Sequence, residues 1–301
     1  MRFARRVGVY GVLRDSDRIL VVRDGGDGEF PGVWRLPGGA VEHAEDPERA
    51  VVRTVAEQTG LTVTTGRLRT VIADVTERPE GVATHTDRLV FDLTAGDDTT
   101  GVGAPGGPVD QVRRLTSAES ALITLTPFTA EVLGRPVTPL PSGTHRPPEP
   151  LPPAHPDRRL RFGAYGLVTD PAGRILLTQI ADGYPGAGLW HLPGGGTDHG
   201  EQPTTGLLRE LVEEGGQVGR VVDLLGVDNL HNPAALGPEG RPLDWHGVRV
   251  IYRVLVDVPT DAVVTESAGG STARAAWFTS AQAADLPLSD IAAAAIGQSG
   301  R

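Results

Sequence analysis

The sequence contains neither cysteine nor lysine among its 301 residues. The absence of cysteine excludes disulfide bonds, zinc–thiolate sites and a thiol nucleophile. All 28 basic side chains are therefore arginine, which excludes a P-loop lysine and Schiff-base chemistry. The sequence also has no 18-residue apolar run and no N-terminal apolar segment, so we expect neither a membrane span nor a signal peptide. We therefore expect a soluble, cytoplasmic protein.

The charge balance is acidic, with a formal net charge of −10. A protein that binds nucleic acid through phosphates needs a basic surface, so we expect no nucleic-acid partner and no membrane partner. Apolar residues make up 39% of the chain and charged residues 22%, as in ordinary globular proteins. The length indicates two domains.

An internal repeat organises the chain. Residues 8–13 match 163–168, and residues 32–39 match 188–195, so each half carries a copy of one domain. We predict domains at 1–134 and 158–301. Residues 135–157 between them include nine prolines, which favours an extended linker, with a partner-binding proline motif as the alternative.

The most informative stretch is residues 194–216. It opens with three glycines, which allow a loop to turn freely and to approach other groups closely. Pro203 suits the first turn of a helix, and the apolar residues Leu207, Leu208 and Leu211 follow at helical spacing. We therefore expect a glycine-rich loop followed by a helix with one buried face.

Three glutamates share another face of this helix: Glu210, Glu213 and Glu214. Residues three and four apart are neighbours on a helix surface, and like charges placed there repel. The pattern fits either a solvated acidic face or a site at which a divalent cation reverses the repulsion. Hard carboxylate oxygens suit Mg²⁺ or Mn²⁺.

The glycines and charges of this stretch follow a longer pattern. It consists of Gly195, Glu201, Arg209-Glu210 and Glu213-Glu214-Gly215-Gly216 at fixed spacings. This pattern resembles the signature box of the Nudix hydrolase superfamily. Gln217 is the one departure, because the family usually has an aliphatic residue there; this affects packing at the end of the box.

The resemblance implies an α+β fold: two α/β/α sandwich domains with mixed central sheets, joined by the proline-rich linker. It also implies a metal-dependent hydrolase that cleaves the pyrophosphate of a nucleoside diphosphate linked to another group, such as a nucleotide sugar or ADP-ribose. The expected ligands of Mg²⁺ or Mn²⁺ are Glu210, Glu213, Glu214 and the Gly195 carbonyl.

The resemblance gives further residues supporting roles. Glu201 and Arg209 are expected to form an ion pair that orients the metal-binding carboxylates. The general base is either Glu210 or Glu266, because some relatives use a glutamate outside the box. Glu266 lies in a stretch rich in glycine and serine that suits a mobile lid.

The first copy of the box is damaged. Thr54 stands where the second copy has Glu210, and Gln58 stands where it has Glu214. Only Glu57 of the three carboxylates remains, and a single carboxylate binds Mg²⁺ poorly. We expect this domain to be catalytically inactive, serving a structural role, lending a loop to the active site, or sensing a ligand.

Other features of the second copy are less specific. We expect strands at 161–169, 174–179 and 248–258, a long loop at 229–245, and a closing helix at 285–296. His246 and Arg249 at the start of the long strand are candidate substrate-binding residues.

Two other functions stay open. One is a regulator that senses a nucleotide or sugar, and the other is a nucleoside triphosphate pyrophosphohydrolase. The expected partner is a small molecule, and the expected assembly is either a monomer whose two domains mimic a dimer or a homodimer.

Overall fold

A computed structural model describes residues 2–77, 81–96, 105–146, 157–236, 240–265 and 270–299. The chain divides into two compact units. Unit 1 comprises Met1–Leu160 together with His231–His246, and unit 2 comprises Arg161–Leu230 and Gly247–Arg301. Among the described residues, no helix is both long enough and apolar enough to cross a membrane.

The elements of the first repeat form one mixed sheet with three helices. The sheet has the strand order β3-β2-β1-β6-β5, with β4 paired to β1 and β7 paired to β2. β1 and β6 run parallel, whereas β5 and β6 are antiparallel. The elements are β1 (Arg2–Asp15), β2 (Arg18–Asp24), β3 (Trp34–Arg35), β4 (Gly38–Ala40), α1 (Pro47–Thr59), β5 (Val63–Glu77), β6 (Val82–Ala95), β7 (Val109–Thr116), α2 (Ser117–Ser120) and α3 (Pro127–Val132).

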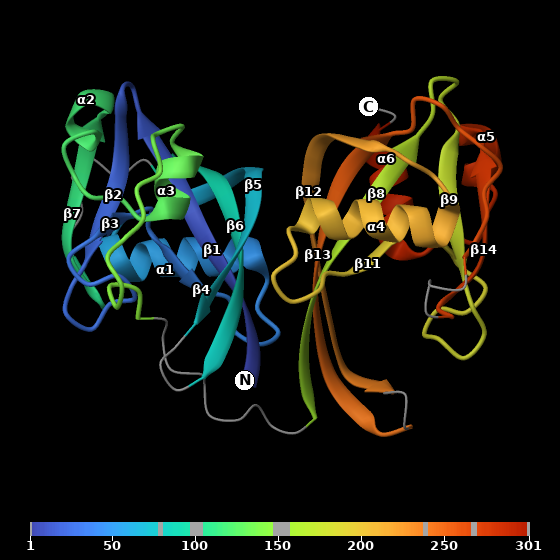
Figure 1. Ribbon diagram of the computed structural model, residues 1–301, viewed down its shortest axis with the longest axis horizontal. Helices are drawn as coiled ribbons and strands as arrows, with labels where there is room; N and C mark the ends of the chain where they lie inside the picture. Colours follow the sequence, from blue (N-terminus) through green and yellow to red (C-terminus); the bar gives the residue numbers. More distant parts are fainter. Residues whose placement is uncertain are drawn as a thin grey trace. The chain divides into compact units, whose positions relative to one another are not determined.

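Helices cover both faces of this sheet. Successive side chains of β1 point to opposite faces, so neighbouring residues of this strand contact different helices. Tyr10 and Val12 point into a core shared with Phe128 of α3. Gly11 faces the other way, and a Cβ there would lie 3.6 Å from Val51 of α1. Figure 1 shows α1 lying across the sheet.

The second repeat has the same topology. Its sheet order is β10-β9-β8-β13-β12, with β11 paired to β8 and β14 paired to β9. Figure 1 shows α4 crossing this sheet as α1 crosses the first. The elements are β8 (Arg158–Thr169), β9 (Ile175–Ile180), β10 (Trp190–His191), β11 (Gly194–Gly196), α4 (Pro203–Gly215), β12 (Arg220–Leu236), β13 (Pro242–Leu255), β14 (Thr272–Phe278), α5 (Ser280–Ala284) and α6 (Asp290–Ser299).

The second sheet also has two covered faces. Leu167 of β8 packs in a core cluster with Ile291 and Ala292 of α6. On the opposite face, a Cβ at Gly166 would lie 3.3 Å from Leu207 of α4. The predicted fold class, two α+β domains built on mixed sheets, is therefore confirmed.

Two sequence predictions differ from the structure. The stretch predicted as a long loop, 229–245, belongs largely to β12 and β13, which form long strands like β5 and β6 of the first repeat. The closing helix begins at Asp290 rather than at 285. Pro287 disfavours helical geometry in the residue before it. The Pro287 carbonyl also accepts a hydrogen bond from the Trp190 amide at 2.8 Å, outside any helix.

The predicted limits of the domains at 134 and 157 stay predictions. Part of the predicted linker, residues 147–156, lies outside the described residues. In the described part, the Arg146 amide donates to the Glu29 carbonyl at 2.7 Å, so this end of the segment contacts the first repeat.

Candidate functional site

Helix α4 carries the acidic cluster because its two faces differ in chemistry. Pro203 begins the helix, and Gly216 ends it with a φ of 65° that suits glycine. Leu207 and Leu211 are fully buried and anchor one face to the sheet. The glutamates on the other face line a cavity of about 500 Å³, a size typical of small-molecule sites.

Five of the predicted site residues line this cavity. Its walls come from β8, β9, β10, β11, α4, the start of β14 and the loop between β9 and β10. The predicted residues among the lining are Gly195, Arg209, Glu210, Glu213 and Glu214. The predicted metal ligands therefore share one cavity.

Arg209 holds the carboxylates in place from one side. Its guanidinium donates twice to Glu201, from Nε to Oε1 and from Nη2 to Oε2, each at 3.1 Å. Nη1 donates to Glu210 at 2.9 Å and to Glu213 at 3.2 Å. The hydrogen bond to Glu201 raises the pKa of Arg209, so this positive charge is permanent. The planar fork fixes the direction of three carboxylates at once.

Glu214 is the most buried of the three box glutamates, with 5% of the residue exposed. Its carboxylate accepts from the Gly194 amide at 2.9 Å and from the Thr272 hydroxyl at 2.6 Å. Burial raises the pKa of Glu214 to about 7, and burial likewise raises the pKa of Glu210. Both carboxylates therefore bind protons more readily than usual. A cation bound beside them would lower their pKa values again.

Glycine is required where the loop meets the helix and the sheet. Gly194 has a φ of 134°, and a Cβ there would lie 2.3 Å from the Ala164 carbonyl. A Cβ at Gly195 would lie 2.9 Å from the Glu210 carboxyl carbon. These residues therefore allow backbone atoms to approach the acidic cluster closely.

The donor set fits a hard divalent cation. Glu210, Glu213 and Glu214 supply carboxylate oxygens, and Gly195, whose carbonyl is the fourth predicted ligand, also lines the cavity. Mg²⁺ and Mn²⁺ prefer oxygen ligands of this kind. The raised pKa values of the buried carboxylates agree, because a bound cation would stabilise their ionised forms.

Sequence reasoning did not single out several lining residues. Arg161 on β8 lines the cavity, and its guanidinium lies so close to the loop that a Cβ at Gly196 would be 2.7 Å from Nε. His191 on β10 bonds to the Ser289 hydroxyl through Nδ1 at 2.6 Å. Burial and the nearby charge of Arg249 lower the pKa of His191 to about 4, so the ring is neutral at pH 7. The signal for Arg161 was its match to Arg6 in the repeat.

The remaining predicted residues lie elsewhere. Arg249 donates from Nε to Asp228 at 2.7 Å, and its charge acts on His191 and Tyr165 beside the cavity. His246 is fully buried in unit 1 and is not among the lining residues. Glu266 lies outside the described residues. The substrate-binding roles of Arg249 and His246 and the base role of Glu266 stay predictions.

The first box keeps the ion pair but not the acidic cluster. Arg53 donates from Nε to Glu45 at 2.7 Å, as Arg209 does to Glu201. Gln58 occupies the position of Glu214, and the guanidinium of Arg35 lies 3.4 Å from its side-chain oxygen. Arg35 is itself buried and paired with Asp24 at 2.8 Å. A fixed positive group therefore already lies beside this box.

The first repeat contains a second buried charge cluster, centred on Glu29. Glu29 contacts Arg6, Arg88 and His145. Burial alone would raise the pKa of Glu29, but the hydrogen bond with His145 and the arginine charges lower it overall. His145 also stacks on Phe30 with 4.3 Å between ring centroids. In this cluster one carboxylate is neutralised by surrounding cations, whereas the second box gathers three carboxylates.

Comparison with known families agrees with this geometry. The profile of the NUDIX domain matches residues 2–135 and again residues 158–296, which together make up most of the chain. The chain belongs to the NUDIX family. It does so as a tandem protein, which confirms the resemblance found in the sequence. NUDIX hydrolases generally use divalent metal ions.

Two curated relatives match shorter stretches. An ADP-ribose pyrophosphatase of Methanocaldococcus jannaschii is 35% identical over 99 residues, covering 31% of this chain and 56% of the relative. An 8-oxo-dGTP diphosphatase of Escherichia coli is 36% identical over 53 residues, covering 17% of this chain and 41% of the relative. The chain spans about half the length of the curated relatives that it matches.

Solved structures also resemble single NUDIX domains of the chain. The NUDIX domain of Shewanella oneidensis NrtR, complexed with ADP ribose, is 22% identical with a TM-score of 0.39, covering 47% of this chain and 86% of that one. A MutT protein from Methanosarcina mazei is 20% identical with a TM-score of 0.38, covering 44% and 94%.

Proposed function

We propose that the second NUDIX domain is a Mg²⁺-dependent hydrolase of a nucleoside diphosphate linked to another group, of the ADP-ribose or nucleotide-sugar type. One observation carries this proposal: three carboxylates of α4 line a cavity of about 500 Å³ together with Arg209, which is itself paired with Glu201. A diphosphate is polyanionic, so a site with this many carboxylates binds it only together with cations.

Glu210, Glu213, Glu214 and the Gly195 carbonyl would hold the metal. A divalent ion held there would supply positive charge to the diphosphate and would favour ionisation of the attacking water. Within the chain, Arg209 keeps Glu201, Glu210 and Glu213 in fixed directions. A site held in this way loses little free energy in reorganisation when the reaction begins.

Arg161 supplies positive charge at the cavity wall. Its charge lowers the pKa of Tyr165 and of Glu210, against the larger effect of burial, so it lies within electrostatic reach of both. A guanidinium here can bind a phosphate oxygen through two N–H groups. We assign Arg161 to the non-reacting phosphate of the substrate.

The general base is Glu210 or Glu266. Glu210 borders the cavity, and burial raises its pKa, which makes its carboxylate a stronger base. Glu266 follows Thr265, whose amide and hydroxyl donate to the Glu213 carbonyl at 2.9 and 3.0 Å. Thr265 is the last described residue before 266–269, so Glu266 stays the alternative base on the resemblance alone.

The relatives rank the substrates to be tested. The archaeal match, named an ADP-ribose pyrophosphatase, covers more of this chain than the bacterial 8-oxo-dGTP diphosphatase does. ADP-ribose-like substrates therefore come first and nucleoside triphosphates second.

The test separates the reaction products by chromatography. ADP-ribose, nucleotide sugars and nucleoside triphosphates, including 8-oxo-dGTP, are incubated with the full chain and Mg²⁺. We expect ADP-ribose and one water to give AMP and ribose 5-phosphate, and we expect Glu213→Gln to abolish this reaction. If ADP-ribose binds but is not hydrolysed at any metal concentration, the hydrolase proposal is wrong and the protein is a ligand sensor. Turnover restricted to triphosphates would establish the sanitising activity instead.

A further inference from the structure

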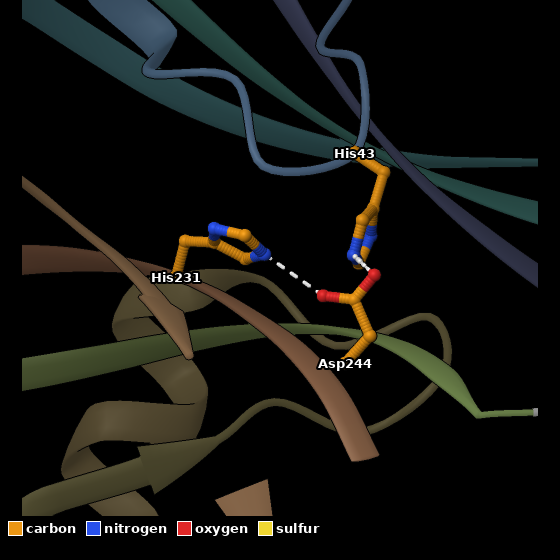
Figure 2. Close-up of side chains that lie close together, drawn as sticks. All are labelled: His43, His231 and Asp244. Atoms are coloured by element: carbon orange, nitrogen blue, oxygen red, sulfur yellow. Dashed lines mark hydrogen bonds and ion pairs between the residues drawn. The ribbon is translucent and has the colours of Figure 1, made fainter. Parts of the chain in front are cut away.

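Three side chains of unit 1 form a cluster that the acidic site does not use. His43 comes from the loop between β4 and α1, His231 from β12 and Asp244 from β13. Figure 2 shows both imidazole rings turned toward the carboxylate, one from each side. One ligand atom from each residue lies within 4.8 Å of the other two.

The distances resemble those between ligands of one ion. His231 Nε2 lies 2.8 Å from Asp244 Oδ1, and His43 Nε2 lies 3.1 Å from Asp244 Oδ2. Two ligands bound at about 2.0–2.2 Å in tetrahedral geometry are roughly 3.4 Å apart. The two histidine–aspartate pairs therefore need only small movements to surround one ion.

The backbone presents His43 in a fixed direction. Ala44, the next residue, has a φ of 67°, which non-glycine residues rarely adopt, and Gly200 has the same position in the second box. The Ala44 amide donates to Nδ1 of the fully buried His246 at 3.2 Å. The His246 ring also packs edge-on against His43, with 5.5 Å between centroids. The loop is thus held so that Nε2 of His43 points at Asp244.

The ligand chemistry differs from that of the acidic helix. Two imidazole nitrogens and one carboxylate oxygen suit Zn²⁺ and related transition-metal ions, whereas Mg²⁺ prefers oxygen alone. Three protein ligands leave a coordination position for water. The one competing cation near Asp244 among the described groups, besides the histidines, is Arg158 at 3.4 Å, and its half-exposed side chain can turn into solvent.

We propose that His43, His231 and Asp244 bind one divalent transition-metal ion of the Zn²⁺ class. The ion fastens the loop of the degenerate first box to the ends of β12 and β13 within unit 1. The ion has a structural role in the first repeat, and its binding does not require the box carboxylates that this repeat has lost. The site does not depend on the proposed hydrolase activity.

Cobalt is the probe, because Co²⁺ replaces Zn²⁺ at such sites and absorbs visible light. The full chain without a polyhistidine tag is stripped with EDTA and titrated with Co²⁺, and bound metal is counted by mass spectrometry. The titration is repeated in the Glu213→Gln protein, in which the acidic site is weakened. We expect the visible band and one Co²⁺ per chain to persist in Glu213→Gln, and Zn²⁺ to displace the Co²⁺.

The variants locate the ion. Asp244→Asn keeps the shape of the side chain, and His231→Gln removes a second ligand at a partly exposed position. Each should lose the visible band and one bound Co²⁺, with an unchanged far-ultraviolet spectrum. His199→Gln is the matched control, since His199 has the place of His43 in the second box and is exposed; it should keep both. The proposal fails if Glu213→Gln binds no Co²⁺, or if His231→Gln and Asp244→Asn bind as much as the parent.

Discussion

Gln58 and Gly38 are joined by two hydrogen bonds. The Gly38 amide donates to Gln58 Oε1 at 3.0 Å, and Gln58 Nε2 donates to the Gly38 carbonyl at 2.7 Å. In the second box, Glu214 accepts from the Gly194 amide in the same way, but its ionised carboxylate has no hydrogen to donate to the Gly194 carbonyl. In the first box, both polar atoms of the Gln58 side chain therefore bond to the Gly38 backbone. In the second box, the other carboxylate oxygen of Glu214 accepts a hydrogen bond from the Thr272 hydroxyl.

Glu213→Gln should reduce kcat/KM by more than about 100-fold, because even residues that only orient metal ligands cost 10–100-fold when changed. Glu214→Gln should do the same, since its amide can donate back to Gly194 as Gln58 does to Gly38. The measurement is steady-state hydrolysis of the best substrate over a range of Mg²⁺ concentrations.

The matched control is Glu57→Gln, the same change at the same position of the first box. Within the part of the chain that the structure describes, Glu57 forms an ion pair with Arg53, and its side chain is largely exposed. We expect its kcat/KM to stay within twofold of the parent. Equal losses from Glu57→Gln and Glu213→Gln would show that both boxes take part in catalysis.

Much of this architecture was predictable from the sequence because it depends on local patterns. The repeat indicated two similar domains, and the spacing from Gly195 to Gly216 placed the acidic residues on one helix face. Helical periodicity and glycine turns are set by neighbouring residues, so they can be read without a structure. The cavity brings those same residues together.

The rest depends on contacts between distant residues. The sequence pattern did not single out Arg35, which is buried beside Gln58 and paired with Asp24. His43 lies about 200 residues from Asp244 in the chain. The stretch 229–245 is rich in loop-forming residues, and its strands exist because β12 and β13 extend within a sheet. Contacts between distant residues can outweigh the local conformational preference of a segment, and they cannot be predicted from the sequence pattern of that segment.

Arg209→Lys should lower kcat/KM by about 10–100-fold although the charge is kept. Lysine cannot reproduce the two parallel hydrogen bonds to Glu201 while also reaching Glu210 and Glu213. The apparent Mg²⁺ affinity should fall as well, because two of these glutamates are proposed ligands. Arg53→Lys in the first box is the control, and a similar loss there would contradict the assignment.

The unfolding temperature of the metal-free second domain should fall as the pH rises from 5 to 8. Burial raises the pKa of Glu214 from 4.5 to about 7, so the folded state binds more protons than the unfolded state between these values. Stability is then present below pH 4.5 and is lost as pH rises through 7, by about 3 kcal/mol at about 1.4 kcal/mol per pKa unit.

Calorimetry in EDTA from pH 5 to 8 checks this dependence. Glu214→Gln should flatten the curve, because its amide stays neutral, and saturating Mg²⁺ should oppose the loss by binding the ionised carboxylate. Thr272→Val, which removes the hydroxyl that donates to Glu214, should steepen it. An unchanged slope in Glu214→Gln would assign the effect to another group.

Asp24→Asn should destabilise the first domain by roughly 3–5 kcal/mol, because it leaves the buried guanidinium of Arg35 without its charge partner. Asp24 also accepts from the Phe30 amide at 2.8 Å, so the loop at 25–33 should loosen with it. Differential scanning calorimetry measures the loss. Asp257→Asn, which breaks the exposed pair with Arg220, should leave the unfolding transition unchanged.

Restoring the two missing carboxylates should not restore the first site. In Thr54→Glu, Gln58→Glu, the new Glu at 58 would lie beside the Arg35 guanidinium, now 3.4 Å from the Gln58 oxygen, and would pair with it rather than with Mg²⁺. Tested in the Glu213→Gln background, this double variant should show no turnover and no Mg²⁺ binding by calorimetry. Adding Arg35→His, the residue of the second box, removes the fixed charge and should raise Mg²⁺ affinity above that of the double variant. Binding by the double variant alone would show that the missing carboxylates, and not the guanidinium, are what inactivates the first box.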